Sequence, residues 1–266
     1  MIYPTFIEFF DSMPKCNREL HTANTVHLKP YSDEVYSFVL PFRGAIERCV
    51  LLDSKGIEHT IANVSVVRII DMAFLNISNI MFDDWNLARL KIYTAVTGGA
   101  YYSSFIRVSS NDIDETTYIK YRDNGWQFFG GIRLNLSYWH KKPFNENTAY
   151  YQVTREQSIS VGSKRDHRER YYLNNVSIGA ATALCDILTY PIVYFNGIRT
   201  SCPELPEIPD LQACENFIST DVWVSKNYDD KDENNIDLSV YVIGNRQLNE
   251  IIGDGNNNII NSNINV

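Results

Sequence analysis

Apolar and polar residues alternate with a period of two along much of this chain, and this pattern limits the folds that it can adopt. The alternation recurs in five runs, at residues 36–42, 65–70, 87–96, 116–123 and 132–139. Because successive side chains of a strand point to opposite faces, a period of two predicts strands that bury one face. The 17 Tyr and 13 Phe residues favour the same structure, since flat rings pack well on a pleated surface.

The run 132–139 shows the pattern most clearly. Its even positions from Ile132 to Tyr138 are apolar or aromatic, and its odd positions from Arg133 to Ser137 are polar. We therefore expect a single half-buried antiparallel strand in this run.

Turn signals separate the runs. Residues 54–56 form a Ser-Lys-Gly turn signal, and Asn124-Gly125 is a pair that suits a type I′ turn because both positions tolerate a positive φ. We expect this pair to close a tight hairpin between residues 116–123 and about 126–129.

One segment has helical periodicity instead. Its apolar residues recur every three or four positions, at Ile178, Ala181, Leu184 and Leu188. Ser177 is the expected N-cap, and Pro191 is expected to stop the helix. The predicted fold is therefore mainly β: an antiparallel β-sandwich or barrel with long hairpins and one amphipathic helix at about 177–190.

Three segments are predicted along the chain. Residues 1–85 form an N-terminal β-rich segment, and residues 86–252 form a central β domain that includes the helix. Residues 253–266 are an Asn-rich C-terminal tail with few apolar groups. Burial of those groups within the chain would not offset a backbone ordering cost of about 1–2 kcal/mol per residue, so we expect the tail to dock on a partner.

Charge and cysteine usage exclude several classes of protein. A formal net charge of −8 argues against stable, sequence-independent binding of nucleic acid, which depends on Lys and Arg contacts to phosphates. No secretory leader begins the chain, and no window approaches the roughly 18 apolar residues of a membrane span, so we expect a soluble chain without membrane insertion. The odd number of widely spaced cysteines favours reduced thiols over a disulfide framework or zinc site. These cysteines are Cys16, Cys49, Cys185, Cys202 and Cys214.

The sequence predicts no catalytic residue, no metal ligand and no cofactor, and so no enzyme. The five His residues are scattered singly, and no phosphate loop or nucleophile elbow is present. His140 is a candidate general base, but a His at a strand end is more often a surface residue. Asp83-Asp84 is a candidate glycosidase pair, but adjacent acids usually point apart, which favours a solvated loop.

The segment 163–172 is strongly basic and lies between strand patterns. It fits either the exposed tip of a long hairpin or a docking surface for an acidic partner, and residues 227–235 have the opposite sign. A molecule with one basic and one acidic exposed segment can pair head to tail with its own copies. The candidate interface residues in the basic segment and the tail are Lys164, Arg165, Arg168, Arg170, Ile259, Ile260, Ile264 and Val266.

The central part of the chain resembles a family of known proteins. The motifs that carry the resemblance are, in order, LARLKIYTAV, YYSSFIRVSS, TTYIKYRD, IRLNLSYW, AYYQV and YYLNNVSI. This order, over about residues 86–224, resembles a virion tail protein type of tailed bacteriophages of Bacteroides-like hosts, including crAss-like phages. The resemblance implies a structural protein located in the virion tail, and in the host cytoplasm during assembly.

Within that tail we expect an adaptor or hub subunit that forms a ring with copies of itself. Its other partners would be tube, muzzle, fibre or baseplate proteins, and it would act by burying interfaces. The alternative is a receptor-binding or carbohydrate-binding β domain, in which Trp126, Trp139 or Trp223 stacks on sugar rings. A ring subunit self-associates or binds other virion proteins, whereas a carbohydrate-binding domain binds glycans.

Overall fold

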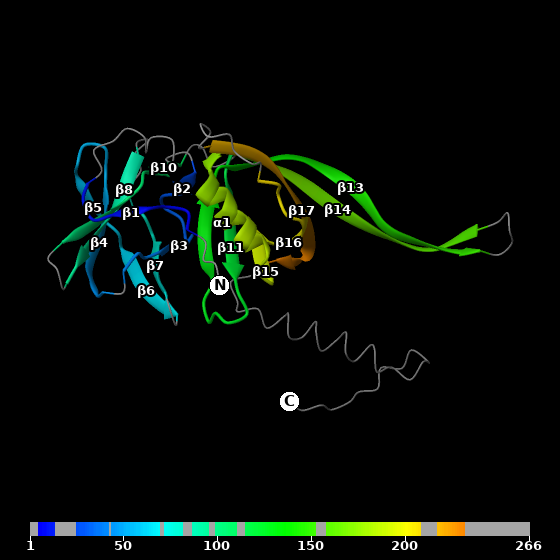
Figure 1. Cartoon of the computed structure of the whole chain (residues 1–266), viewed down its shortest axis with the longest axis horizontal. Helices are drawn as coiled ribbons and strands as arrows, with labels where there is room; N and C mark the ends of the chain where they lie inside the picture. The colour runs from blue at the N-terminus through cyan, green and yellow to red at the C-terminus, as the bar shows by residue number, and fades with distance from the viewer. Residues whose placement is uncertain are drawn as a thin grey trace, which may run out of the picture. The chain divides into compact units, whose positions relative to one another are not determined.

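Strands make up most of the described structure (Figure 1). The computed structural model describes the backbone of residues 5–13, 25–42, 44–69, 72–81, 87–95, 99–110, 115–152, 158–208 and 217–231. Side chains are described for these residues except at 140–152, 158–167, 203, 217 and 227–231. The described residues up to 230 belong to one compact unit.

The first eight strands belong to the N-terminal half of the chain. They are β1 (Phe9–Phe10), β2 (Val26–Leu28), β3 (Tyr36–Val39), β4 (Ile46–Leu52), β5 (Glu58–Thr60), β6 (Asn63–Ile69), β7 (Met72–Ser78) and β8 (Leu87–Thr94). The remaining strands and the helix are β9 (Ala100–Ser103), β10 (Ile106–Val108), β11 (Thr117–Arg122), β12 (Gly130–Leu134), β13 (Leu136–Gln152), β14 (Ser158–Ser177), α1 (Ile178–Leu188), β15 (Ile192–Phe195), β16 (Ile198–Glu204) and β17 (Phe217–Lys231).

These strands form two sheets. A fourteen-stranded sheet has the order β1-β9-β8-β10-β2-β12-β11-β15-β16-β17-β14-β13, with β4 and β5 attached at β8, and a three-stranded sheet has the order β3-β7-β6. The pairing of β10 with β2 is parallel, so the large sheet is mixed. The prediction of a mainly β fold is confirmed, and the arrangement is consistent with a sandwich; the described strands do not close into a barrel.

Strands from before and after residue 85 pair with each other. β4 pairs with β8, and β2 lies between β10 and β12. The predicted segments 1–85 and 86–252 therefore contribute to one sheet. The predicted tail 253–266, with its four candidate interface residues, lies outside the described residues.

The predicted alternation is clearest in β11. Thr117, Ile119 and Tyr121 are buried, whereas the three residues between and after them are only partly buried. The helix prediction is also confirmed. The Ser177 hydroxyl accepts a hydrogen bond from the Ala180 amide at 3.2 Å, and α1 ends before Pro191. An apolar face of α1, which includes Leu184 and Ile187, is buried in the core.

The run 132–139 is not one half-buried strand, so that prediction is wrong. Asn135 separates β12 from β13, and its amide donates to the Thr25 carbonyl at 3.1 Å. All residues of β12 are buried, including Arg133. The reason is that β12 lies between β11 and β2 and also approaches β3, where a Cβ on Gly131 would collide with the Val35 carbonyl. Neither face of β12 is therefore left to solvent.

Asn124-Gly125 lies at the centre of a turn, but the predicted tight hairpin between residues 116–123 and about 126–129 is wrong, and the turn is not type I′. The Trp126 amide donates to the Asp123 carbonyl at 3.0 Å, and neither central residue has a positive φ. The partner strand begins at Gly130, because buried Trp126 stacks on Phe128 and draws the connection into the core.

The tight two-residue hairpin lies elsewhere, at Asn196-Gly197. These residues have φ values of 50° and 79°, and they join β15 to β16 directly after the Phe195–Ile198 pair. The Asn196 side chain also accepts a hydrogen bond from the Tyr118 amide at 2.9 Å. This pair has the positive φ values that a type I′ turn requires.

A buried ion pair joins the two sheets. The Arg133 guanidinium donates from Nε to Glu34 at 2.9 Å and from Nη1 to the Thr116 hydroxyl at 2.9 Å. The Tyr36 hydroxyl, from the three-stranded sheet, donates to the same Glu34 carboxylate at 2.6 Å. Burial, together with the Glu34 charge, raises the pKa of Tyr36 far above its usual value, so this hydroxyl stays protonated.

The two Asn-Gly turns predict different effects of the same Gly→Ala substitution on stability. Gly197→Ala should lower the free energy of unfolding by about 1 kcal/mol, because its φ is in the left-handed region. Gly125→Ala should be neutral or slightly stabilising, because its φ is ordinary and the added Cβ has open space. Urea denaturation measures both. Equal losses in the two variants would contradict the assignment of the turns.

Candidate functional site

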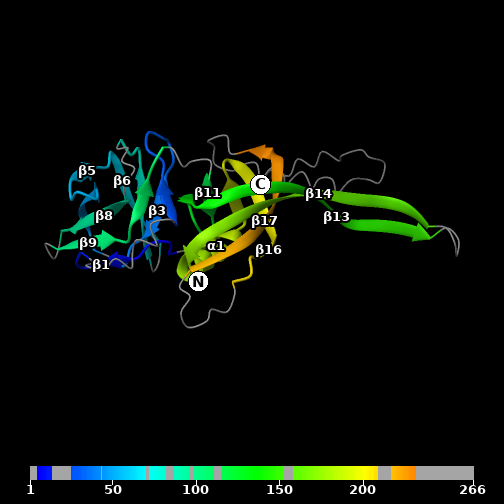
Figure 2. The ribbon, with the colours of Figure 1, turned by 90° about the horizontal axis from the view of Figure 1, so that it is seen from above.

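β13 and β14 form a hairpin that extends beyond the other strands. β14 pairs with β17 only from Arg168 to Ser177. Beyond that point, residues 142–152 of β13 and 158–167 of β14 pair only with each other among the described residues, and we call these two stretches the outer hairpin. Figures 1 and 2, which differ by a 90° turn, both show it as a two-stranded ribbon leaving the sheet.

The basic segment 163–172 is not the tip of this hairpin, so that prediction is wrong. It lies within β14, and its last residues are held in the sheet. Arg168 is only 5% exposed and forms an ion pair with Glu204 at 3.3 Å. Arg170 is bound to Asp221. Lys164 and Arg165 belong to the outer hairpin, and their side chains are not among those that the structure describes.

Two indole rings flank Arg170 at the base of the hairpin. Its guanidinium carbon lies 4.3 Å from the centre of the Trp139 ring and 5.8 Å from that of Trp223. The hydrogen bond to Asp221 raises the pKa of Arg170, so the cation is retained. Trp139, Arg170, Asp221 and Trp223 form what we call the hairpin base cluster. Stacking of Arg on Trp stabilises such a cluster by about 0.5–1 kcal/mol at exposed sites.

Two aromatic residues near the start of β13 are unusually exposed. Tyr138 is 52% exposed and Trp139 is 57% exposed. Trp, Tyr and Arg are the residue types that dominate binding energy at protein interfaces. Trp126, by contrast, is only 5% exposed and is surrounded by aromatic rings, which excludes it as a sugar-stacking residue.

A second ion pair lies on the opposite face of the same strands. The Lys226 ammonium is 2.9 Å from the Glu169 carboxylate, and both side chains are buried. The Tyr171 hydroxyl donates to the same carboxylate at 3.0 Å. The base of the hairpin is thus fixed on both faces, which makes it a rigid support for the outer hairpin.

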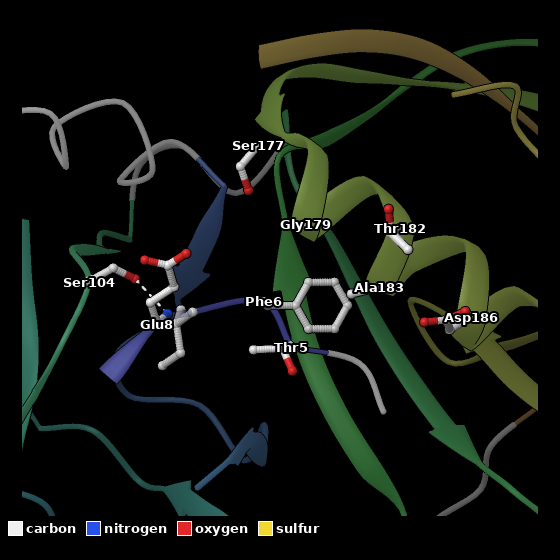
Figure 3. A pocket seen from close by; sticks show the side chains of 10 residues that line it. Thr5, Phe6, Glu8, Ser104, Ser177, Gly179, Thr182, Ala183 and Asp186 are labelled. Carbon is white, nitrogen blue, oxygen red and sulfur yellow. Dashed lines mark hydrogen bonds between the residues drawn. The ribbon is translucent and has the colours of Figure 1, made fainter. Parts of the chain in front are cut away.

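A cleft lies between the N-terminal segment and α1 (Figure 3). Its volume is about 270 Å³. The lining residues are Thr5, Phe6, Ile7, Glu8, Ser104, Ser177, Gly179, Thr182, Ala183 and Asp186. The Glu8 amide donates to the Ser104 hydroxyl at 3.2 Å, which fixes the N-terminal segment beside β9. Burial raises the pKa of Asp186.

The other described residues that could bind a metal or act as nucleophiles are dispersed. Within the described residues, no three His, Cys, Asp or Glu side chains are grouped to hold a metal ion. Three of the predicted reduced cysteines, Cys49, Cys185 and Cys202, are free thiols. Burial raises the pKa of Cys49 to about 12 and that of Cys202 to about 11, which makes both thiols poor nucleophiles at neutral pH.

Two histidines and one acidic pair complete the set of candidate residues. Asp83-Asp84 lies outside the described residues, and the backbone of His140 belongs to β13. His59, which the sequence did not single out, bonds to Asp53 at 3.1 Å beside the β4–β5 turn. No described helix has the length and apolar character needed to span a membrane.

The structure brings together residues that the sequence could not connect. Trp139, Arg170 and Trp223 were each singled out, but their contact depends on the register of three strands. Asp221, Glu8 and Asp186 were missed, because isolated acidic residues carry no periodic signal. Comparison with protein-family models, with curated proteins and with solved structures finds no match to this chain. Its function is therefore inferred from its own sequence and geometry.

The exposure of the two Trp residues predicts opposite results for matched truncations. Trp126→Ala should cost about 3–5 kcal/mol of unfolding free energy, because it empties a buried aromatic site. Trp139→Ala should cost about 1 kcal/mol or less, because it removes one exposed stacking contact. Urea denaturation of the isolated protein measures both losses. A large loss in Trp139→Ala would show that this ring belongs to the core and not to a contact surface.

Proposed function

We propose that this chain is a structural subunit of a bacteriophage tail, an adaptor or hub that forms a ring with its own copies and contacts other tail proteins. Two features support this proposal. One is the resemblance of residues 86–224 to tail proteins of crAss-like phages. The other is the outer hairpin, which is the single observation that carries the proposal.

The outer hairpin is a poor candidate for an independent element. A two-stranded ribbon alone in water is marginally stable at best, because it buries little apolar surface. Ordering its backbone costs about 1–2 kcal/mol per residue. Its strands pair with nothing else among the described residues. A partner surface would supply the missing contacts, and providing such contacts between subunits is the role of a structural assembly protein.

The charge of the hairpin differs from that of the remaining chain. Residues 142–167, from the first residue of the outer hairpin to its last, carry four Lys or Arg and three Asp or Glu, a net charge of +1. The rest of the chain carries a net charge of −9, so the chain as a whole has a net charge of −8. Attraction between the hairpin of one copy and the body of another would favour head-to-tail contacts, which build rings when the rotation closes.

The exposed Trp139 supports a second candidate function. An exposed indole beside an Arg and an Asp is also suited to stacking on a sugar ring, as in a receptor-binding or carbohydrate-binding domain of a tail fibre or baseplate. The two functions differ in what the isolated chain binds. Glycan binding by a monomer that does not self-associate would favour this second function.

Shortening the hairpin tests the proposal. In the hairpin-shortened variant, an Asn-Gly turn replaces residues 143–167. This turn joins Lys142 to Arg168, which is its partner in the β13–β14 pairing. All β14–β17 pairs remain, so the melting temperature should change by only a few degrees. Self-association in sedimentation velocity should be lost, whereas the full chain should form oligomers. A shortened chain that assembles like the full chain would refute the role of the hairpin.

A protein inventory of purified phage particles tests the tail assignment itself. The chain should be present in multiple copies per particle, in a fixed ratio to the other tail proteins. Its absence from particles that contain those proteins would refute the assignment.

A further inference from the structure

The cleft beside α1 has the chemistry of a receptor for cationic side chains. It is lined by the carboxylates Glu8 and Asp186, and by hydroxyl groups that include Thr182. No Lys, Arg or His is among the lining residues. Burial raises the pKa of Asp186, so its charged form is destabilised in the isolated chain. A cation beside this carboxylate would offset that cost.

The arrangement of the cleft favours an extended ligand over a small ion. In Figure 3, Glu8 stands beside Ser104 on one side of the Phe6 ring, and Asp186 lies on the other side along α1. A volume of about 270 Å³ is just below the range of about 300–1,000 Å³ that is typical of small-molecule pockets. Two carboxylates on different sides of the Phe6 ring suit a segment with more than one positive side chain better than a single ion.

We propose that this cleft receives the basic outer hairpin of a second copy of this chain. The inference rests on the proposed function and names the surface that the hairpin contacts. Residues 142–167 supply four Lys or Arg side chains and a net charge of +1, opposite in sign to the cleft. Opposite charges on two surfaces steer association and fix the orientation of the partners.

The hairpin cannot reach the cleft of its own chain. Ser177 lines the cleft and ends β14, whereas the outer hairpin begins ten residues earlier in the same strand, at His167. At about 3.3 Å per residue, ten residues of extended strand span about 33 Å. The pairing of β14 with β13 and β17 keeps that strand extended. The contact is therefore between copies, and because hairpin and cleft are different surfaces it is head to tail.

Neutralising the cleft tests the inference. Glu8→Gln combined with Asp186→Asn should weaken self-association in sedimentation equilibrium by about tenfold or more, without unfolding the chain. The matched control is Glu47→Gln combined with Glu115→Gln, which removes the same charge from two exposed positions outside the cleft. The control should assemble like the unmodified chain.

A mixing experiment tests whether the hairpin of one copy binds the cleft of another. The neutralised-cleft variant retains a hairpin, and the hairpin-shortened variant retains a cleft. Each should remain monomeric alone, and their mixture should form a one-to-one dimer that cannot grow. A monomeric mixture, or a neutralised-cleft variant that assembles like the unmodified chain, would overturn the inference and leave the proposed function intact. An unmodified chain that stays monomeric would overturn both.

Discussion

The ion pair between Glu34 and Arg133 is the interaction on which the rest of the structure depends. Arg133 belongs to β12 in the large sheet, and Glu34 precedes β3 in the small one. Both groups are largely buried, so loss of either partner would leave an uncompensated charge at a cost of about 3–5 kcal/mol. That is a large part of a typical stability of about 5–15 kcal/mol. Gly131 permits the close approach that places the two groups together.

After this junction the chain enters a hairpin that is fixed at its base and extends beyond the other strands. β12 is fixed on both faces, the chain turns at Asn135, and β13 then leaves the sheet beside β14. The hairpin base cluster on one face and the Glu169–Lys226 pair on the other anchor the hairpin up to Arg168. Such an arm could hold a basic surface at a fixed distance from the body. In a ring around a DNA channel, the acidic remainder would repel phosphate and let DNA pass without binding.

The sequence predicted the elements better than their partners. The alternation in β11 and the N-cap of α1 depend on neighbouring residues, so both were predictable. The burial of Arg133 was not, because the periodicity of a strand does not show whether a second sheet covers its polar face. The turn at Asn124-Gly125 was misassigned because Trp126 packs into the core, which no local signal reveals. The hairpin base cluster and the cleft combine residues distant in sequence, so only the fold brings them together.

Amide hydrogen exchange of the outer hairpin, followed as protein concentration rises, tests the central claim most directly. The account predicts fast exchange in residues 142–152 and 158–167 of the monomer, because their ladder lacks support from other strands. It predicts strong protection of the same residues at concentrations where the chain assembles. Exchange that stays equally fast at every concentration, in a chain whose sedimentation shows oligomers, would show that the hairpin is not the assembly contact.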